Sequence, residues 1–372
     1  MPENIEIIAG HCSVLNLGGV LSMGYGLNQM NEVTKPYKIS FRQRGGAWKP
    51  RTESQTNKKR NFEGVGPIGL EWLAKSAKEF GIPIATEIMY AGDLVHFFHR
   101  LDPLRDIAWA GARDNMNYAL LAYLGLSPFN ILLKSPLHGI NTKEAKGSLD
   151  RITYPTEDEN IITDYKHLSR PYPNSRVSNP NKQIIYCIRG QSWPIGPDGR
   201  LDESQYERLL ERRDQHRGSR NVNNVASIQV LREHPYFQEH GIKLFYDPSH
   251  VFGGEGDIKA GITPNQMRKL IGEYAIMAIK EFEYDGLMIE VNDTSKAAKT
   301  DKEQALVTTY NGIDYSETNM GTEPSESDRP FSLVEIVKEL INIQFGRGLG
   351  VPPEKLKRDL LTLDNIRWNS SL

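Results

Sequence analysis

Eight short apolar runs recur along this chain of 372 residues, and they constrain its fold more than any other feature. Several of the runs are continuously apolar, which is typical of strands buried on both faces in a parallel sheet. Polar residues or glycines separate them. The runs are Ile5–Ala9, Tyr37–Phe41, Ile82–Met89, Ile107–Ala112, Asn130–Lys134, Gln183–Arg189, Ile242–Asp247 and Gly286–Val291.

Helix-like segments lie between these runs. Pro67–Phe80 places apolar residues on one face and ends before Gly81, as an amphipathic helix does. The segment after the first run is the weakest helix candidate, because four glycines interrupt it. Strands that alternate with helices in this way indicate an α/β fold, a (β/α)8 TIM barrel. Three further helix candidates are Asn115–Leu124, Asn265–Phe282 and Leu333–Phe345.

The chain is longer than a typical barrel of about 250 residues, so roughly a hundred residues need another explanation. Long segments of this kind in compact domains are usually lids, binding loops or disordered connections. We predict one catalytic barrel over residues 1–346, with insertions in the loops on its C-terminal face, and a C-terminal extension over residues 347–372. The long segments all follow strands, and they are Glu53–Asn61, Ser135–Lys182, Gln191–Asn221 and Asn292–Pro330.

The composition narrows the class of protein. A formal net charge of −2 argues against non-specific binding to nucleic acid or to an anionic membrane. The longest nearly apolar stretch, Tyr118–Leu126, is far shorter than the ~18 residues that span a bilayer. The two cysteines, Cys12 and Cys187, cannot form a disulfide framework. We therefore expect a cytoplasmic protein without nucleic-acid or membrane partners.

Basic residues gather near the ends of the predicted strands, where the active site of such a barrel lies. If they converge in one pocket, a multiply anionic ligand such as a phosphorylated carboxylate would have to compensate their repulsion. The alternative is that each is an ordinary surface cation, although that explanation weakens for a set at consecutive strand ends. The six residues are Arg44, Lys49, Arg51, Arg113, Lys134 and Arg189.

A second group of residues near strand ends could bind a metal. A thiolate, an imidazole and two carboxylates suit a borderline divalent ion such as Mn, Fe, Co or Zn. No local spacing motif supports this set, which comes from the first, seventh and eighth strands, neighbours once a barrel closes. Taken alone, Cys12 is more often a small buried residue and His250 a hydrogen-bonded loop histidine. The pair His96 and His99 is expected to be structural. The candidate ligands are Cys12, His250, Glu290 and Asp301.

Eight motifs in this chain together resemble type I 3-deoxy-D-arabino-heptulosonate 7-phosphate (DAHP) synthase, and more closely the branch that it shares with 3-deoxy-octulosonate 8-phosphate synthase. They occur in the family's order, from about residue 5 to about residue 306. The motifs are Ala9–Ser13, Arg44–Thr52, Thr86–Met89, Gly111–Arg113, Leu133–Lys134, Arg189–Gly190, Asp247–His250 and Gly286–Val291.

The resemblance implies a role for each matching residue. Arg44, Lys49, Arg113, Lys134 and Arg189 would hold phosphoenolpyruvate, and Cys12, His250, Glu290 and Asp301 would bind the divalent metal. Lys49, Pro50, Arg51 and Thr52 would hold the phosphate of an aldose, and this segment favours erythrose 4-phosphate. Lys134 or Glu87 would move protons. The resemblance thus implies DAHP synthesis in the shikimate pathway of aromatic amino acid biosynthesis, by a homo-oligomer, dimer or tetramer.

The chain departs from the family around the aldehyde substrate. Glu53-Ser54 follows Thr52 where the family usually has Ser-Pro, and an acid there would repel a sugar phosphate. The acceptor could therefore be another aldose or aldose phosphate, such as arabinose 5-phosphate, in specialised metabolism. A barrel that binds anionic sugars without catalysis is the alternative of another class. Because no segment precedes the first strand, we expect no appended regulatory domain.

Overall fold

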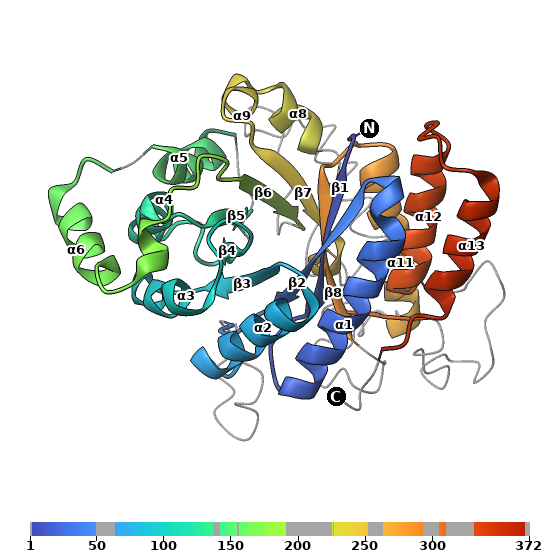
Figure 1. The fold of residues 1–372 in the computed structure, drawn as a ribbon. Helices are drawn as coiled ribbons and strands as arrows, with labels where there is room; N and C mark the ends of the chain where they lie inside the picture. Colours follow the sequence, from blue (N-terminus) through green and yellow to red (C-terminus); the bar gives the residue numbers. More distant parts are fainter. Residues whose placement is uncertain are drawn as a thin grey trace.

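The computed structural model describes residues 2–49, 64–136, 142–154, 156–190, 225, 227–251, 263–292, 305–309 and 331–368. In these residues eight parallel strands pair in chain order, and β1 also pairs with β8, so that the sheet closes into a barrel (Figure 1). The predicted (β/α)8 fold is confirmed. The strands are β1 (Ile5–His11), β2 (Ile39–Gly45), β3 (Ile84–Ile88), β4 (Ile107–Ala110), β5 (Asn130–Lys134), β6 (Ile184–Arg189), β7 (Lys243–Asp247) and β8 (Gly286–Asn292).

The second strand is the one that the sequence misplaces most. The apolar pattern predicts Tyr37–Phe41, whereas β2 begins at Ile39 and continues to Gly45. A 3-10 turn, η1 (Lys35–Tyr37), ends α1 at this point, and Lys38 has a φ of 56°, which reverses the chain before the strand. The short strand β9 (Leu306–Val307) pairs with the end of β8.

The helices surround the barrel, and α1, the weakest helix candidate in the sequence, is present as expected. It spans 18 residues despite its glycines. Asn16 caps it by accepting a hydrogen bond from the Gly19 N–H at 2.7 Å. Gly26 admits the ring of Trp368, which would lie 2.2 Å from a Cβ at that position. The helices are α1 (Leu17–Thr34), α2 (Pro67–Phe80), α3 (Leu94–Arg100), α4 (Tyr118–Leu126), α5 (Thr142–Thr153), α6 (Glu159–Ser169), α8 (Ser227–Glu233), α9 (Pro235–Glu239), α11 (Pro264–Lys280), α12 (Leu333–Phe345) and α13 (Pro353–Asp364).

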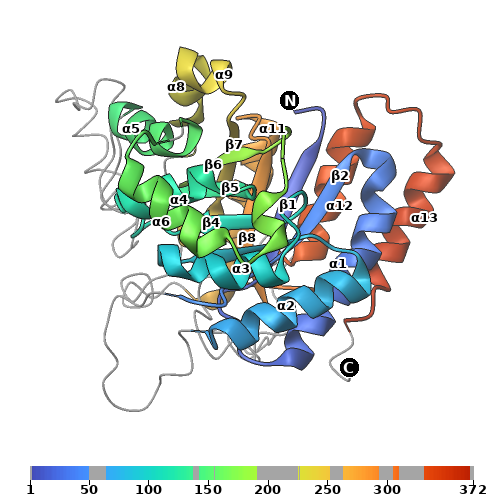
Figure 2. The same ribbon diagram turned by 60° about the vertical axis from the view of Figure 1, so that its left-hand side comes forward.

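The connection Ser135–Lys182 is another correction, because the sequence suggests an irregular loop and the structure contains two helices. Pro171 lies beyond the end of α6, so it does not interrupt that helix. The Asp158 side chain caps α6. Helix α6 packs against α3 and α4 on the outside of the barrel, on the side opposite α13 (Figures 1 and 2). Much of this connection is therefore an outer layer.

The C-terminal helix α13 packs against α1 and α12. Tyr37 donates a buried hydrogen bond of 3.0 Å to Asp359 on α13. The division into a barrel and an extension after residue 346 stays a prediction. Within the described residues, no helix combines the length and the apolar character that crossing a bilayer requires.

Side chains alternate between two cores along each strand. Ile7 and Ala9 belong to the large cluster between strands and helices, whereas Ile8 lies in a second cluster inside the barrel. The interior cluster draws on seven of the strands. Its members are Ile8, Ala85, Ile107, Trp109, Leu132, Ile185, Cys187, Phe245 and Met288. This alternation decides which later residues point into the barrel.

Lys182, just before β6, holds the end of α4. Its Nζ donates to the carbonyls of Leu124, Gly125 and Ser127 at 2.9, 2.9 and 2.7 Å. Lys182→Met should lower the free energy of unfolding by about 3 kcal/mol, because charge-assisted bonds to helix-end carbonyls are lost. Urea denaturation measures this. Lys166→Met, on the exposed face of α6, is the control; an equal loss in both variants would contradict the prediction.

Candidate active site

Five charged side chains enter the barrel because each follows an interior residue by two positions along a strand. Residues two apart on a strand face the same side, so a charge placed at the strand's end points inward above the apolar interior. The chain thus builds a polar layer on an apolar floor, at the C-terminal ends of the strands. The five residues are Glu87, Lys134, Arg189, Asp247 and Glu290.

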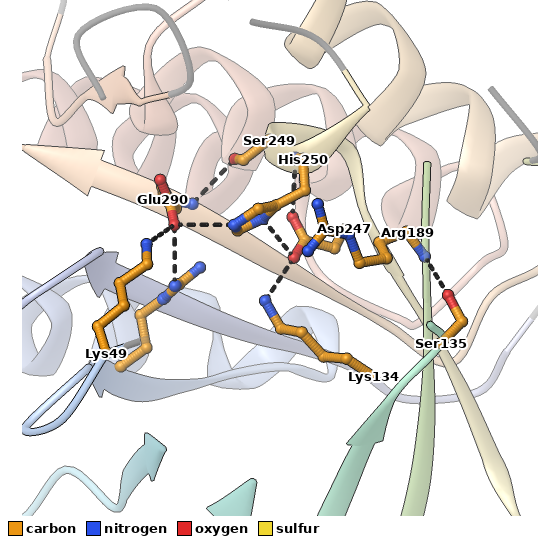
Figure 3. Close-up of polar contacts among 9 residues, drawn as sticks. Lys49, Lys134, Ser135, Arg189, Asp247, Ser249, His250 and Glu290 are labelled. Carbon is orange, nitrogen blue, oxygen red and sulfur yellow. Dashed lines mark hydrogen bonds and ion pairs between the residues drawn. The ribbon is translucent and has the colours of Figure 1, made fainter. Parts of the chain in front are cut away.

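Glu290, fully buried on β8, lies beside several basic groups. Its Oε1 lies 3.1 Å from Arg44 Nη2. It also lies 3.4 Å from Lys49 Nζ and 3.3 Å from His250 Nε2, and Figure 3 shows both of these residues beside it. Burial alone would raise the pKa of Glu290, but Lys49 and the other basic groups lower it to about 2. Glu290 is therefore an anion that neutralises several cations at once.

Asp247, at the end of β7, is the second buried carboxylate. Its Oδ2 lies 2.7 Å from Lys134 Nζ and 2.7 Å from His250 Nδ1 (Figure 3). Burial opposes its ionisation, yet His250 and Lys134 hold the pKa of Asp247 well below its usual value. Burial lowers the pKa of Lys134 despite this partner. The Lys134 ammonium is thus held by the carboxylate of Asp247, while its burial away from water destabilises the charged form.

His250 lies between the two carboxylates, with one ring nitrogen facing each (Figure 3). Its position is fixed by the turn η5 (Pro248–His250), in which its backbone N–H donates to Asp247 Oδ1 at 3.3 Å. Burial lowers the pKa of His250 to about 3, so the imidazole is neutral at pH 7. The Glu290 N–H donates to Ser249 Oγ at 2.9 Å, which ties this turn to β8.

The Arg44 side chain uses only some of its hydrogen-bond donors within the described residues. Its side chain is 2% exposed, and Nη2 reaches Glu290. Its Nε and Nη1 are buried and have no hydrogen-bond partner among the residues that the structure describes. A buried donor without an acceptor costs free energy, and hydrogen bonds from a charged guanidinium to a carboxylate or a phosphate are among the stronger ones in proteins. Arg44 is thus arranged to bind an anion.

Glu87 and Asp114 form a separate acidic pair near the end of β4. Both carboxylates face Gly111, where an added Cβ would lie 2.2 Å from Glu87 Oε1 and 3.4 Å from Asp114 Oδ2. Burial and the charge of Glu87 raise the pKa of Asp114 to about 6, although Arg113 opposes this. The pair can hold a proton in mildly acidic solution.

Asp114→Asn should flatten the dependence of stability on pH between about 4 and 6. A carboxyl whose folded-state pKa is raised from 3.8 to about 6 stabilises the fold below pH 4, and this contribution is lost as pH rises through 6. Thermal unfolding across this range measures the difference. Burial also raises the pKa of Asp106 to about 6, but Asp106 remains in both proteins. Glu87→Gln should move the titration to lower pH; no change in either variant would refute the coupling.

A metal ion fits part of the predicted ligand set. His250 Nε2 and Glu290 Oε1 are 3.3 Å apart, and two atoms bound at about 2.1 Å to one tetrahedral ion lie roughly 3.4 Å apart. Glu290 Oε2 is buried without a hydrogen-bond partner in the described part of the chain. The carboxylate of Asp247 beside Nδ1 is the arrangement that orients a metal-binding imidazole. These two residues could therefore supply two ligands.

The other two predicted ligands, Cys12 and Asp301, stay predictions. Among the described residues, no group of three or more His, Cys, Asp or Glu side chains is spaced to hold a metal. Cys12 is buried just beyond β1, and Asp301 lies outside the described residues. His96 and His99 lie on α3, where His96 is 5.9 Å from the ring of Trp48, between ring centroids.

The predicted phosphoenolpyruvate residues separate into two groups. Arg44, Lys49 and Lys134 meet in the buried cluster, and the charge of Arg189 acts on Lys134 and His250 there. Arg113 stands apart with an exposed side chain. The predicted sugar-phosphate residues Pro50, Arg51 and Thr52 lie outside the described residues.

The sequence alone did not single out Asp247 and Ser249, which organise the cluster. The available signal was the alternation along β7, since Asp247 follows the interior residue Phe245 by two positions. Extending the inward-facing pattern to the end of each strand would have identified Asp247 as a partner for Lys134. Ser249 is recognisable only through its contact with β8.

Comparisons with known proteins agree with this architecture. A family model described as "DAHP synthetase I family" matches residues 3–193. The curated phospho-2-dehydro-3-deoxyheptonate aldolase of Thermotoga maritima is 24% identical over 300 residues, which cover 81% of this chain and 64% of that protein. The chain thus spans less than two thirds of the length of this relative.

Two solved structures from the same organism share the fold. A crystal structure of phospho-2-dehydro-3-deoxyheptonate aldolase (DAHP synthase) superposes with a TM-score of 0.57 at 22% identity, covering 93% of this chain and 70% of that one. A truncated form of 3-deoxy-D-arabino-heptulosonate 7-phosphate synthase gives 0.54 at 20% identity, covering 93% and 88%.

Proposed function

The chain belongs to the DAHP synthetase I family, and from this premise we propose that it condenses phosphoenolpyruvate with an aldose phosphate. The proposed acceptor is erythrose 4-phosphate, and the products are DAHP and inorganic phosphate. The name of the curated relative, a phospho-2-dehydro-3-deoxyheptonate aldolase, supports this reaction. It would make the protein a carbon–carbon bond-forming enzyme of aromatic amino acid biosynthesis.

The observation that carries the proposal is the buried guanidinium of Arg44 with two N–H groups left for an anion. Lys49, Lys134 and Arg189 add positive charge around it, and only part of this charge is balanced by Glu290 and Asp247. Phosphoenolpyruvate carries a carboxylate and a phosphate ester on the same carbon, C2, so it matches a site with several cations.

In the proposed reaction, C3 of phosphoenolpyruvate attacks the aldehyde carbon and water adds at C2. The phosphate then leaves from the tetrahedral intermediate by cleavage of its C–O bond. Arg44, Lys49 and Arg189 would hold the charge that moves onto the departing phosphate, in a site with little water. Arg113 would assist from the rim, where its side chain is exposed.

Proton transfer is assigned to Lys134 and Glu87. Burial lowers the pKa of Lys134, so its ammonium gives up a proton more readily than an exposed lysine, while Asp247 holds Nζ in place. Glu87, together with Asp114, lies where it could deliver or remove a second proton. We propose that one serves the aldehyde oxygen and the other the water that adds at C2.

A divalent metal is proposed as the cofactor, held by His250 and Glu290 and, by resemblance, by Cys12 and Asp301. When bound, it would polarise the aldehyde oxygen as a Lewis acid. Mn, Fe, Co and Zn all suit this donor set. Pro50, Arg51 and Thr52, with Lys49, are proposed to bind the sugar phosphate. The homo-oligomer and the cytoplasmic location stay predictions.

A phosphoenolpyruvate-consumption assay tests the proposal. The purified protein, supplied with Mn or Co, is given erythrose 4-phosphate, arabinose 5-phosphate or unphosphorylated aldoses, with and without a chelator. We expect phosphoenolpyruvate loss and equimolar phosphate release with erythrose 4-phosphate, and loss of both with the chelator. Turnover with a different aldose would correct the identity of the acceptor. No turnover with any aldose would refute the proposed catalytic activity and favour a barrel that binds anionic sugars without catalysis.

A further inference from the structure

Trp109, on β4, is a large buried aromatic side chain that no role assigned above requires. It is 1% exposed and belongs to the cluster inside the barrel. In the sheet it stands opposite Glu87 on one side and Leu132 on the other. Its ring therefore lies at the level where the apolar interior meets the charged layer of the site.

Two of the site's cations approach this one ring. The Arg44 guanidinium carbon lies 5.4 Å from the ring centroid and Lys134 Nζ lies 6.0 Å from it. Both distances fall within the range of cation–π attraction, which is strongest for Trp and for desolvated cations. Arg44 and Lys134 are both buried, so water does not compete for either charge.

An aromatic ring stabilises these cations in a way that a carboxylate cannot. A further carboxylate would accept hydrogen bonds from the guanidinium and would occupy the donors that a ligand needs. The electron-rich ring offsets the cost of burying the charge, while Nε and Nη1 of Arg44 stay without a partner among the described residues. The ring also lies within reach of two like charges from different strands that repel each other.

We propose that Trp109 is a positioning residue that holds Arg44 and Lys134 as a fixed pair of cations for the carboxylate and phosphate of phosphoenolpyruvate. This inference rests on the proposed function, because it names what sets the geometry of that same site. The ring acts on the substrate through the two cations.

Fluorinated tryptophan at position 109 tests the inference, because added fluorines weaken the negative potential of the ring and change its shape little. The dissociation constants of phosphoenolpyruvate and of inorganic phosphate are measured by calorimetry across mono-, di- and trifluorotryptophan. We expect both dissociation constants to rise stepwise, by about tenfold for the most fluorinated protein. In steady-state kinetics, KM for phosphoenolpyruvate should change more than kcat. Trp72 on α2, fluorinated in the same way, is the matched control.

The outcomes separate this inference from the proposed function. If the unmodified protein binds phosphoenolpyruvate and the dissociation constants do not change across the series at position 109, the ring only fills space in the barrel. That result overturns the inference. Tighter binding along the series would also overturn it, since fluorination strengthens the indole N–H as a donor. If the unmodified protein consumes no phosphoenolpyruvate, the proposed function fails, while the phosphate series still tests the cation pair. Because fluorination changes the shape of the ring little, the test does not need a truncated variant such as Trp109→Leu, which would leave a cavity in the barrel.

Discussion

Replacing Arg44 by glutamine is expected to lower kcat/KM for phosphoenolpyruvate by about a thousandfold. The substitution removes a buried charge and both N–H groups that have no partner in the described part of the protein. Arg44→Lys should recover part of this loss, because it keeps a positive charge near Glu290 but lacks the planar guanidinium and its five N–H donors. Steady-state kinetics with phosphoenolpyruvate as the varied substrate measures both variants.

Arg42 provides a matched control on the same strand. It lies two residues before Arg44, but its side chain reaches toward the N-terminal ends of the strands. There it pairs with Glu6 and donates to the carbonyl of Arg105. Arg42→Gln should cost stability and leave kcat/KM within about twofold. If both glutamine variants lost activity equally, the effect of Arg44 would be one of folding, and its role in anion binding would be wrong.

The strand pattern explains why so much of the site was predictable. Parallel strands require apolar residues on both faces, so a charge at a strand end breaks the pattern visibly and can point only into the barrel or away from it. Lys134, His250 and Glu290 were found in this way, and the structure brings all three into one cluster. The same rule applied to Asp247 would have found the partner that Lys134 needs.

The features that sequence reasoning could weigh only poorly depend on contacts between distant segments. The glycines of α1 are poor helix formers in isolation, but Gly26 lies against Trp368 and Gly24 lies close to Ser76, so packing outweighs propensity. Arg113 comes three residues after the end of β4, in a turn, and its side chain is exposed. Its direction is set by the turn after the strand, whose geometry has no periodic signal. The role of Trp109 likewise follows from its neighbours on other strands.

Replacing Glu290 by glutamine should slow catalysis and at the same time strengthen anion binding. Glu290 is a proposed metal ligand and also the carboxylate nearest to Arg44 and Lys49. The amide keeps the shape but loses the negative charge, so we expect loss of bound metal and a fall in kcat of about a thousandfold. Inorganic phosphate should bind about tenfold more tightly, because the two cations no longer face a competing anion.

The stability of Glu290→Gln provides a second test of the same role. A buried cation cluster without its carboxylate should lower the free energy of unfolding by about 3–5 kcal/mol, and saturating phosphate should restore part of it because it binds only the folded state. Thermal unfolding with and without phosphate measures this, next to calorimetric titration. Glu6→Gln, which unpairs Arg42 at the far end of the barrel, should lose stability without any rescue by phosphate. Unchanged or weaker phosphate binding in Glu290→Gln would mean that Glu290 does not compete with the substrate for these cations.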